Sequence, residues 1–322
     1  MKRLFLTAAL FSSTVAGATD IDLSVESGGA NSIIVTPGSN VNYQVVALLS
    51  DNLNEGLGSV LFDVAFDGGS LSKADEPAAL PMINFDRPAG MTNPNGFGGT
   101  EIGGKLIQAG GAQNTILSSF APFPNGTVVT GTGKPSGGSV VVLNGALNAP
   151  LEVGTYTLEL ENIDVNVIRQ GEIGNPFWAV DQAGEGTITS LSIEVRALFG
   201  DVATLSIATP GTQTLSLDAG LANAGRGYWC LGSASGTSPG IYAGPATLPL
   251  NFDFYLNFLF SAPNPPVLQN NFANLDGSGQ ATTLFNLPGH VAPSAVGLVI
   301  DHAFILFPTD YASNVVSVQL TP

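Results

Sequence analysis

Two short patterns in the sequence are typical of serine enzymes. Residues 236–240 read Gly-Thr-Ser-Pro-Gly and match the G-x-S-x-G motif of serine hydrolases. In that motif the backbone N–H of the residue after the serine helps to stabilise the oxyanion, but Pro239 has no N–H. Residues 70–73 read Ser-Leu-Ser-Lys and match S-x-x-K, yet they follow two glycines instead of opening a helix. We therefore expect neither serine to be catalytic.

Oxygen-bearing side chains are grouped in one loop, where Asp51, Asn54 and Glu55 are candidate calcium ligands. Calcium prefers carboxylate and amide oxygens, although the spacing here differs from that of an EF-hand. The alternative is an ordinary polar turn. The loop therefore leaves a calcium site and a polar turn as alternatives, and the sequence indicates no other cofactor.

The histidines and the remaining carboxylates give no clear catalytic pattern. His290 and His302 lie late in the chain without the spacing of a zinc motif. His302 stands in an apolar, strand-like run, so we expect a hydrogen-bonded strand residue. A glycosidase needs only two suitably separated carboxylates, but no motif singles out a pair among the 25 Asp and Glu residues. We expect that the protein is not an enzyme.

Three large amphipathic aromatic residues are candidate binding residues, namely Trp178, Tyr228 and Trp229. In a secreted β-sandwich such rings could stack on sugars, because they combine an apolar face with a polar group. Packing in a core is the alternative for each of them.

The first 18 residues have the organisation of a bacterial signal peptide. Lys2 and Arg3 precede a short apolar run, and small residues follow up to Ala18, where we expect cleavage. This predicts an exported protein, extracellular or on the cell surface. The net charge of −16 becomes −18 when these residues are removed, so nucleic acid and anionic membranes should repel the protein. No later apolar run is long enough to span a membrane.

The composition and the short-range patterns favour strands. Charged residues make up 11% of the chain, while Gly and Pro number 40 and 21. Apolar and polar residues alternate in many short runs, such as 155–160, 191–195 and 215–218, as in half-buried strands. One helix is expected over 253–260. The one cysteine, Cys230, excludes an internal disulfide, and its apolar neighbours favour a buried thiol.

These patterns predict an all-β protein with two antiparallel β-sandwich or jelly-roll domains. The first would span residues 19–197 and the second 198–322, because one strand pattern ends at Val195 and a new one begins at Val202. Residues 76–135 contain many Gly, Pro and Asn residues with apolar residues among them. We expect this stretch to form ordered excursions of the first domain.

The first domain resembles the cohesin family. The similar segments are 35–41 (VTPGSNV), 58–67 (GSVLFDVAFD) and 151–158 (LEVGTYTL). The resemblance implies a nine-stranded jelly roll and a partner that is a dockerin-like protein or a polysaccharide. The long 76–135 segment departs from the cohesin pattern, and no partner-binding residue can be matched. Residues 200–322 resemble a C-terminal module of large secreted bacterial proteins that has no assigned function.

These observations lead to an expected function as an exported, non-catalytic binding or scaffold protein. The first domain would engage a polysaccharide or a protein partner. The alternative is a structural component of the cell surface or matrix without a specific ligand, and a secreted glycan-active enzyme is a third, less favoured reading.

Overall fold

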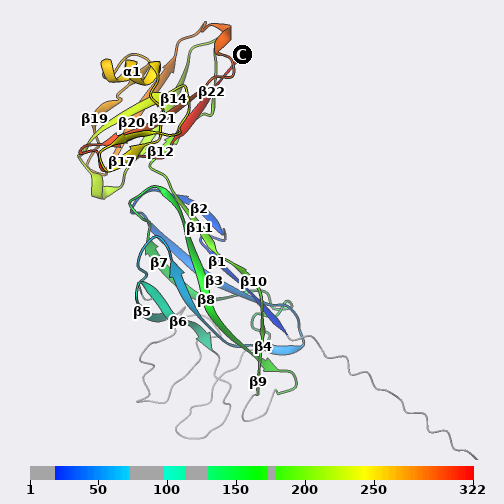
Figure 1. Ribbon diagram of the computed structural model, residues 1–322. Coiled ribbons are helices and arrows are strands. Elements are labelled where there is room, and N and C mark those ends of the chain that lie inside the picture. The colour runs from blue at the N-terminus through cyan, green and yellow to red at the C-terminus, as the bar shows by residue number, and fades with distance from the viewer. Residues whose placement is uncertain (1–18, 73–97, 113–129, 173–178) are drawn as a thin grey trace, which may run out of the picture.

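The computed structural model describes residues 19–72, 98–112, 130–172 and 179–322 (Figure 1). Strands make up most of these residues, which confirms the predicted all-β class. The predicted signal peptide and Trp178 lie outside the described residues. Within the described ranges, no helix is long and apolar enough to cross a membrane.

The first module, residues 19–196, is a sandwich of two sheets. One sheet has the order β10 (Gly184–Thr189), β1 (Asp20–Glu26), β3 (Asn40–Leu49), β7 (Val140–Asn148). The other has the order β2 (Ser32–Val35), β11 (Leu191–Val195), β8 (Gly154–Arg169), β4 (Asn54–Phe66), β6 (Lys105–Ala112), β5 (Gly98–Ile102), and β9 (Val180–Gln182) pairs with β8. The core lies between the sheets because alternate residues of each strand face inward, as Val41, Tyr43 and Val45 do in β3.

The second module, residues 197–322, is also built from two packed sheets. The first has the order β12 (Leu198–Gly200), β14 (Gly211–Asp218), β20 (Gln280–Leu287), β18 (Leu268–Gln269). The second has the order β13 (Thr204–Ser206), β22 (Val316–Thr321), β21 (Val299–Leu306), β15 (Gly227–Ser233), β19 (Phe272–Asn274). Strands β16 (Ile241–Ala243) and β17 (Ala246–Leu248) form a separate hairpin, and two 3-10 turns span Leu221–Asn223 and Pro293–Ala295.

The predicted helix is present as α1 (Phe254–Ser261). It begins after Asp253, whose carboxylate accepts a hydrogen bond from Leu256 N at 2.9 Å and caps the first turn. The strand pattern that begins at Val202 gives the short strand β13, which spans only Thr204–Ser206. Val202 is 38% exposed, and its carbonyl accepts from the Gln213 side chain. The 76–135 stretch contains β5 and β6, and most of its other residues lie outside the described ranges.

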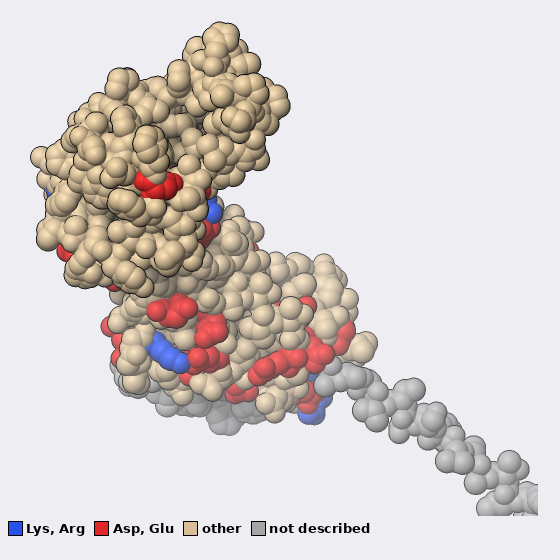
Figure 2. All heavy atoms as spheres, turned by 45° about the horizontal axis from the view of Figure 1, so that its top comes forward, with Lys and Arg blue, Asp and Glu red and all other residues tan. Residues whose placement is uncertain are grey.

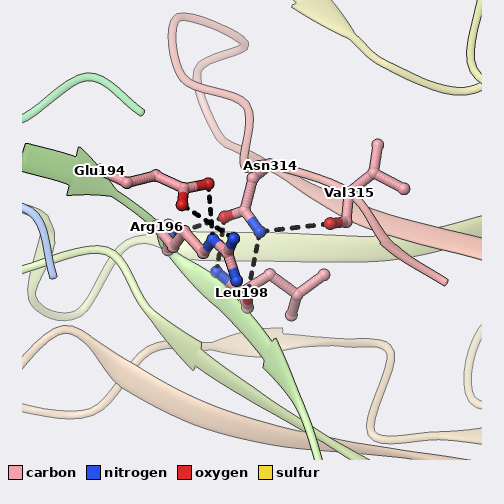
Figure 3. Close-up of polar contacts among 6 residues, drawn as sticks. Glu194, Arg196, Leu198, Asn314 and Val315 are labelled. Atoms are coloured by element: carbon pink, nitrogen blue, oxygen red, sulfur yellow. Dashed lines mark hydrogen bonds and ion pairs between the residues drawn. The ribbon is translucent and has the colours of Figure 1, made fainter. Parts of the chain in front are cut away.

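The two modules have separate hydrophobic cores, and the chain passes from one core to the other at Arg196. Val195 belongs to the first core and Ala197 to the second. Asn314 holds the first residues of the second module by hydrogen bonds within that module, which we call the Asn314 clamp (Figure 3). Its side-chain oxygen accepts from the backbone N–H of Ala197 and Leu198 at 2.8 and 3.0 Å, and its amide donates to the Leu198 carbonyl at 2.8 Å. Whether each module folds by itself stays a prediction.

The two modules contact each other beside this connection. Gly220 of the second module has a φ of +79°, and a Cβ placed on it would lie 2.4 Å from the Pro37 carbonyl oxygen of the first module. Val153 of the first module also packs against the second core. A side chain at position 220 would therefore force the modules apart.

Candidate binding site

The predicted calcium loop is held by hydrogen bonds within the protein. The Asp51 carboxylate accepts from Leu53 N at 2.7 Å and from the Asn54 amide at 3.2 Å. The Lys134 ammonium donates to the Asn54 carbonyl, and Glu55 accepts from Gly171 N at 2.9 Å. Among the described residues, no group of three or more His, Cys, Asp or Glu side chains is arranged to hold a metal. The structure thus places the Lys134 ammonium against the backbone of this loop, and the calcium site stays a prediction.

The two described aromatic candidates occupy different environments. Tyr228 is 2% exposed and donates its hydroxyl to the Asn270 carbonyl at 2.7 Å, so it belongs to the core. Trp229 points to the other side of β15 and is half-buried among three partly exposed phenylalanines. Its ring centroid lies 4.7 Å from that of Phe260 and 5.2 Å from that of Phe272. The Trp229 ring therefore packs edge-to-face in a cluster of aromatic rings on the surface of the second module.

The titratable core residues of the second module are buried and have shifted pKa values. Cys230 is fully buried, as expected, and burial raises the pKa of its thiol to about 12. His302 is also fully buried, and burial lowers its pKa to about 3. Its Nε2 lies 3.3 Å from the Tyr255 hydroxyl, while its Nδ1 has no hydrogen-bond partner in the described part of the chain. The expectation of a strand residue is confirmed, but only one ring nitrogen is hydrogen-bonded.

A polar hollow lies on the outer face of the first module, over β1, β3 and β7. We call it the outer hollow, and its volume is about 380 Å³. It is lined by Glu26, Gly28, Gly29, Asn42, Tyr43, Gln44, Asn144, Gly145 and Ala146. This volume falls in the range of roughly 300–1,000 Å³ that is common for small-molecule sites. The outer hollow is therefore large enough to receive part of an extended ligand.

Strand register brings the polar side chains of the outer hollow into one row. Glu26 of β1 pairs with Gln44 of β3, and Gln44 pairs with Asn144 of β7. Asn42 faces the same side two residues earlier, because side chains alternate along a strand. Ala146 stands opposite Asn42 and is small, so the sheet surface is recessed at this pair.

Three glycines leave space in the outer hollow because they have no side chain, two in the turn after β1 and one on β7. Gly28 and Gly29 have φ values of +60° and +83° and form the turn after β1. Gly145 pairs with Tyr43, and a Cβ on Gly145 would lie only 2.4 Å from the Tyr43 hydroxyl oxygen. The Tyr43 ring thus fills the space under Gly145. Its hydroxyl is buried without a partner among the described residues, and burial raises its pKa well above the ordinary range.

The chemistry of the outer hollow suits a neutral ligand with many hydroxyl groups. The amides of Asn42, Gln44 and Asn144 can each donate and accept hydrogen bonds. The Glu26 carboxylate is held by the Ser24 hydroxyl at 2.9 Å and can accept more. Lys and Arg are absent from the residues that line the hollow, so nothing in it would attract an anionic ligand.

The candidate residues chosen from the sequence do not lie in the outer hollow. Sequence reasoning followed carboxylate groups and large aromatics, whereas this site is built from two amides at alternate positions of β3 and one amide opposite them on β7. The pattern Asn42-x-Gln44 on an alternating strand was the available signal. The pairing with Asn144, about 100 residues further on, could not be read from the sequence.

The comparisons with known proteins complete the description. The sixth cohesin of scaffoldin B from Acetivibrio cellulolyticus, solved in complex with a Cel5 dockerin variant, matches over 55% of this chain and 99% of its own, at 12% identity and a TM-score of 0.29. The ectodomain of a teleost fish polymeric Ig receptor matches over 94% of this chain and 98% of its own, at 11% identity and a TM-score of 0.28. No family model and no curated protein matches the sequence. The chain's own sheets and cores show that its fold class is all-β, with sheets packed as sandwiches.

Proposed function

We propose that the protein is an exported, non-catalytic binding protein whose first module binds a neutral polysaccharide through the outer hollow. The observation that carries the proposal is the row Glu26–Gln44–Asn144 with Asn42 beside it, open to solvent and without a cation in its lining. Amide and carboxylate groups set in one row by strand register can hydrogen-bond the hydroxyl groups of successive sugar units. The resemblance of the first module's sequence to cohesins is consistent with a role in a polysaccharide-related assembly.

Charge also favours a neutral ligand over an anionic one. The first module carries 19 acidic and six basic residues. Figure 2 shows several patches of Asp and Glu side chains on its visible surface and few Lys or Arg side chains. An anionic polysaccharide would be repelled by this field at low ionic strength, whereas a neutral chain would not.

A protein partner is the second candidate, because the cohesin-like segments also suit a dockerin-like ligand. Such a partner would cover a broad sheet surface instead of one hollow. Mutations confined to the outer hollow would then have little effect on binding. The two candidates are therefore separated by the same set of variants.

The test compares two double variants on the same pair of strands. Gln44→Ala with Asn144→Ala removes the centre of the row. Asn40→Ala with Asn148→Ala removes a paired, exposed, outward-facing couple outside the hollow. Retention on insoluble neutral polysaccharides and affinity gel electrophoresis with soluble ones measure binding. We expect the first variant to lose at least tenfold in affinity and the second to bind like the original chain.

Two results would contradict the proposal. The first is a chain that binds no neutral polysaccharide. The second is equal binding by both double variants. Release of reducing sugar that disappears when one carboxylate is replaced would favour a glycan-active enzyme instead.

A further inference from the structure

We propose that a second hollow, at the junction of the two modules, binds a neutral oligosaccharide that touches both of them. This junction hollow has a volume of about 410 Å³. The residues that matter for the argument are Thr36 of the first module and Phe199, Ser216, Asp276, Gln280 and Thr282 of the second. The inference does not rest on the outer hollow, because none of its residues is shared with that site.

Strand register places an aromatic ring beside two hydroxyl groups. Phe199 of β12 pairs with Ser216 of β14, which pairs with Thr282 of β20. All three side chains face away from the core, and Phe199 is half-buried while the other two are exposed. No hydrogen bond of the Ser216 or Thr282 hydroxyl is found within the described ranges. A ring with adjacent free hydroxyls offers an apolar face for a sugar ring and hydrogen bonds for its edge.

A fixed carboxylate and an amide form the next row of the junction hollow. Asp276 accepts hydrogen bonds from the backbone N–H of Ser278 and Gln280 at 2.8 and 2.9 Å, which orient its carboxylate. The Gln280 amide donates to Asp218 at 2.9 Å, and Asp218 also accepts from Gly220 N at 3.0 Å. These side chains are therefore held in place before a ligand arrives, which lowers the entropy lost on binding.

The first module supplies the opposite wall, and the junction keeps it close. Thr36 precedes Pro37, whose carbonyl oxygen lies against Gly220. The Asn314 clamp in Figure 3 fixes the strand that carries Phe199, because it binds the backbone of Ala197 and Leu198 just before it. An oligosaccharide in this hollow would contact both modules and stabilise their arrangement.

The charge of the lining again selects a neutral ligand. Asp218 and Asp276 lie in the junction hollow, while Lys and Arg are absent from its lining. Hydrogen bonds from the backbone N–H groups of Gln280 and Ser278 lower the pKa of Asp276, so its carboxylate is charged at neutral pH. A carboxylate accepts hydrogen bonds from sugar hydroxyls but repels sulfated or uronic-acid sugars.

The experiment uses the full chain carrying Gln44→Ala and Asn144→Ala, so that the outer hollow does not contribute. Neutral cello-, xylo-, manno- and malto-oligosaccharides are titrated, and binding is followed by calorimetry and by backbone amide chemical shifts. We expect saturable binding of at least one of them, with shifts in both β14 and the 36–39 turn. Phe199→Leu keeps the apolar volume but removes the aromatic ring, and we expect it to weaken binding about tenfold.

The matched control is Thr214→Val, on the same face of β14 and outside the junction hollow. We expect Thr214→Val to bind like its parent, whereas Ser216→Ala with Thr282→Val binds more weakly. Thermal unfolding of each variant checks that it is folded. The inference is overturned when no neutral oligosaccharide binds, or when Phe199→Leu and Thr214→Val bind equally well. Loss of binding in the Phe199 variant together with normal binding in the Gln44/Asn144 variant would support the junction hollow and contradict the outer one.

Discussion

The two modules share an architecture, but their solvent-exposed surfaces differ in the number of charged and aromatic side chains. The first carries 19 acidic residues, whereas the second, residues 197–322, carries six acidic residues and one arginine. On the face drawn in Figure 2 the second module is almost free of charge. It instead exposes aromatic rings on and beside α1, including Phe254, which is 86% exposed, and Phe252, which is 68% exposed. Packed sheets thus fix the core of each module and leave the outer face open to different chemistry.

The largest expected effects on the free energy of unfolding come from mutations in the two cores, which test whether the modules unfold as separate units. Leu158 is fully buried in the first core and Leu306 in the second. Each Leu→Ala change should lower the free energy of unfolding by about 2–5 kcal/mol, because it removes buried apolar contacts and leaves a cavity. Calorimetry of the full chain should show two transitions, with each variant lowering only one of them.

Exposed leucines provide the controls for this test. Leu53 of the first module is 59% exposed and Leu221 of the second is 75% exposed. Their replacement by Ala should change stability by less than about 0.5 kcal/mol. A single transition that both core variants lower together would show that the modules unfold as one unit, and the comparison would then concern surfaces only.

The second-largest expected difference between the modules is in their stability at acid pH, because the buried His302 belongs to the second module. The pKa of His302 is about 3 in the folded protein, against about 6.5 for an unfolded chain. Between these values the unfolded state binds a proton that the folded state does not. Stability from this group is therefore complete above about pH 6.5 and is lost as the pH falls towards 3, by a few kcal/mol.

The measurement is the unfolding temperature of the second module at several pH values. His302→Gln keeps a polar group near Tyr255 but does not titrate, so its stability should depend less on pH in this window. We expect the gap between the original chain and the variant to narrow as the pH falls. Parallel curves for the two proteins would show that other groups control the acid response.

Local elements could be predicted from the sequence in both modules, whereas the two hollows could not. Alternation at 191–195 and 215–218 correctly predicted strands, and Asp253 before an aromatic run predicted the helix, because these signals are local. Both hollows depend on pairing between distant strands, such as Gln44 with Asn144 and Ser216 with Thr282. Register of that kind is set by the whole fold, so the sequence offered only the Asn42-x-Gln44 alternation for the outer hollow and no comparable local signal for the junction hollow.

Removal of the Asn314 clamp should lower the free energy of unfolding by less than the core mutations do. Asn314→Ala leaves the N–H groups of Ala197 and Leu198 without the side-chain oxygen that accepts from both. A buried donor that loses its partner costs about 1–3 kcal/mol. We expect this loss in the transition of the second module, together with greater protease sensitivity near residue 197. Asn264→Ala, which breaks side-chain bonds to Phe272 and none to residues 197 or 198, should leave that sensitivity unchanged.

The ion pair beside the clamp should have the smallest effect. Arg196 donates two hydrogen bonds to Glu194 at 2.7 and 2.8 Å, but both side chains are 39% exposed. Water and salt screen such pairs, so Arg196→Gln should cost no more than about 1 kcal/mol, and less at high salt. Chemical denaturation at low and high ionic strength measures this difference. A loss as large as that of Asn314→Ala would mean that screening is weaker at this pair than its exposure implies, and the chain on the two sides of residue 197 would then depend on charge as well as on the uncharged hydrogen bonds of Asn314.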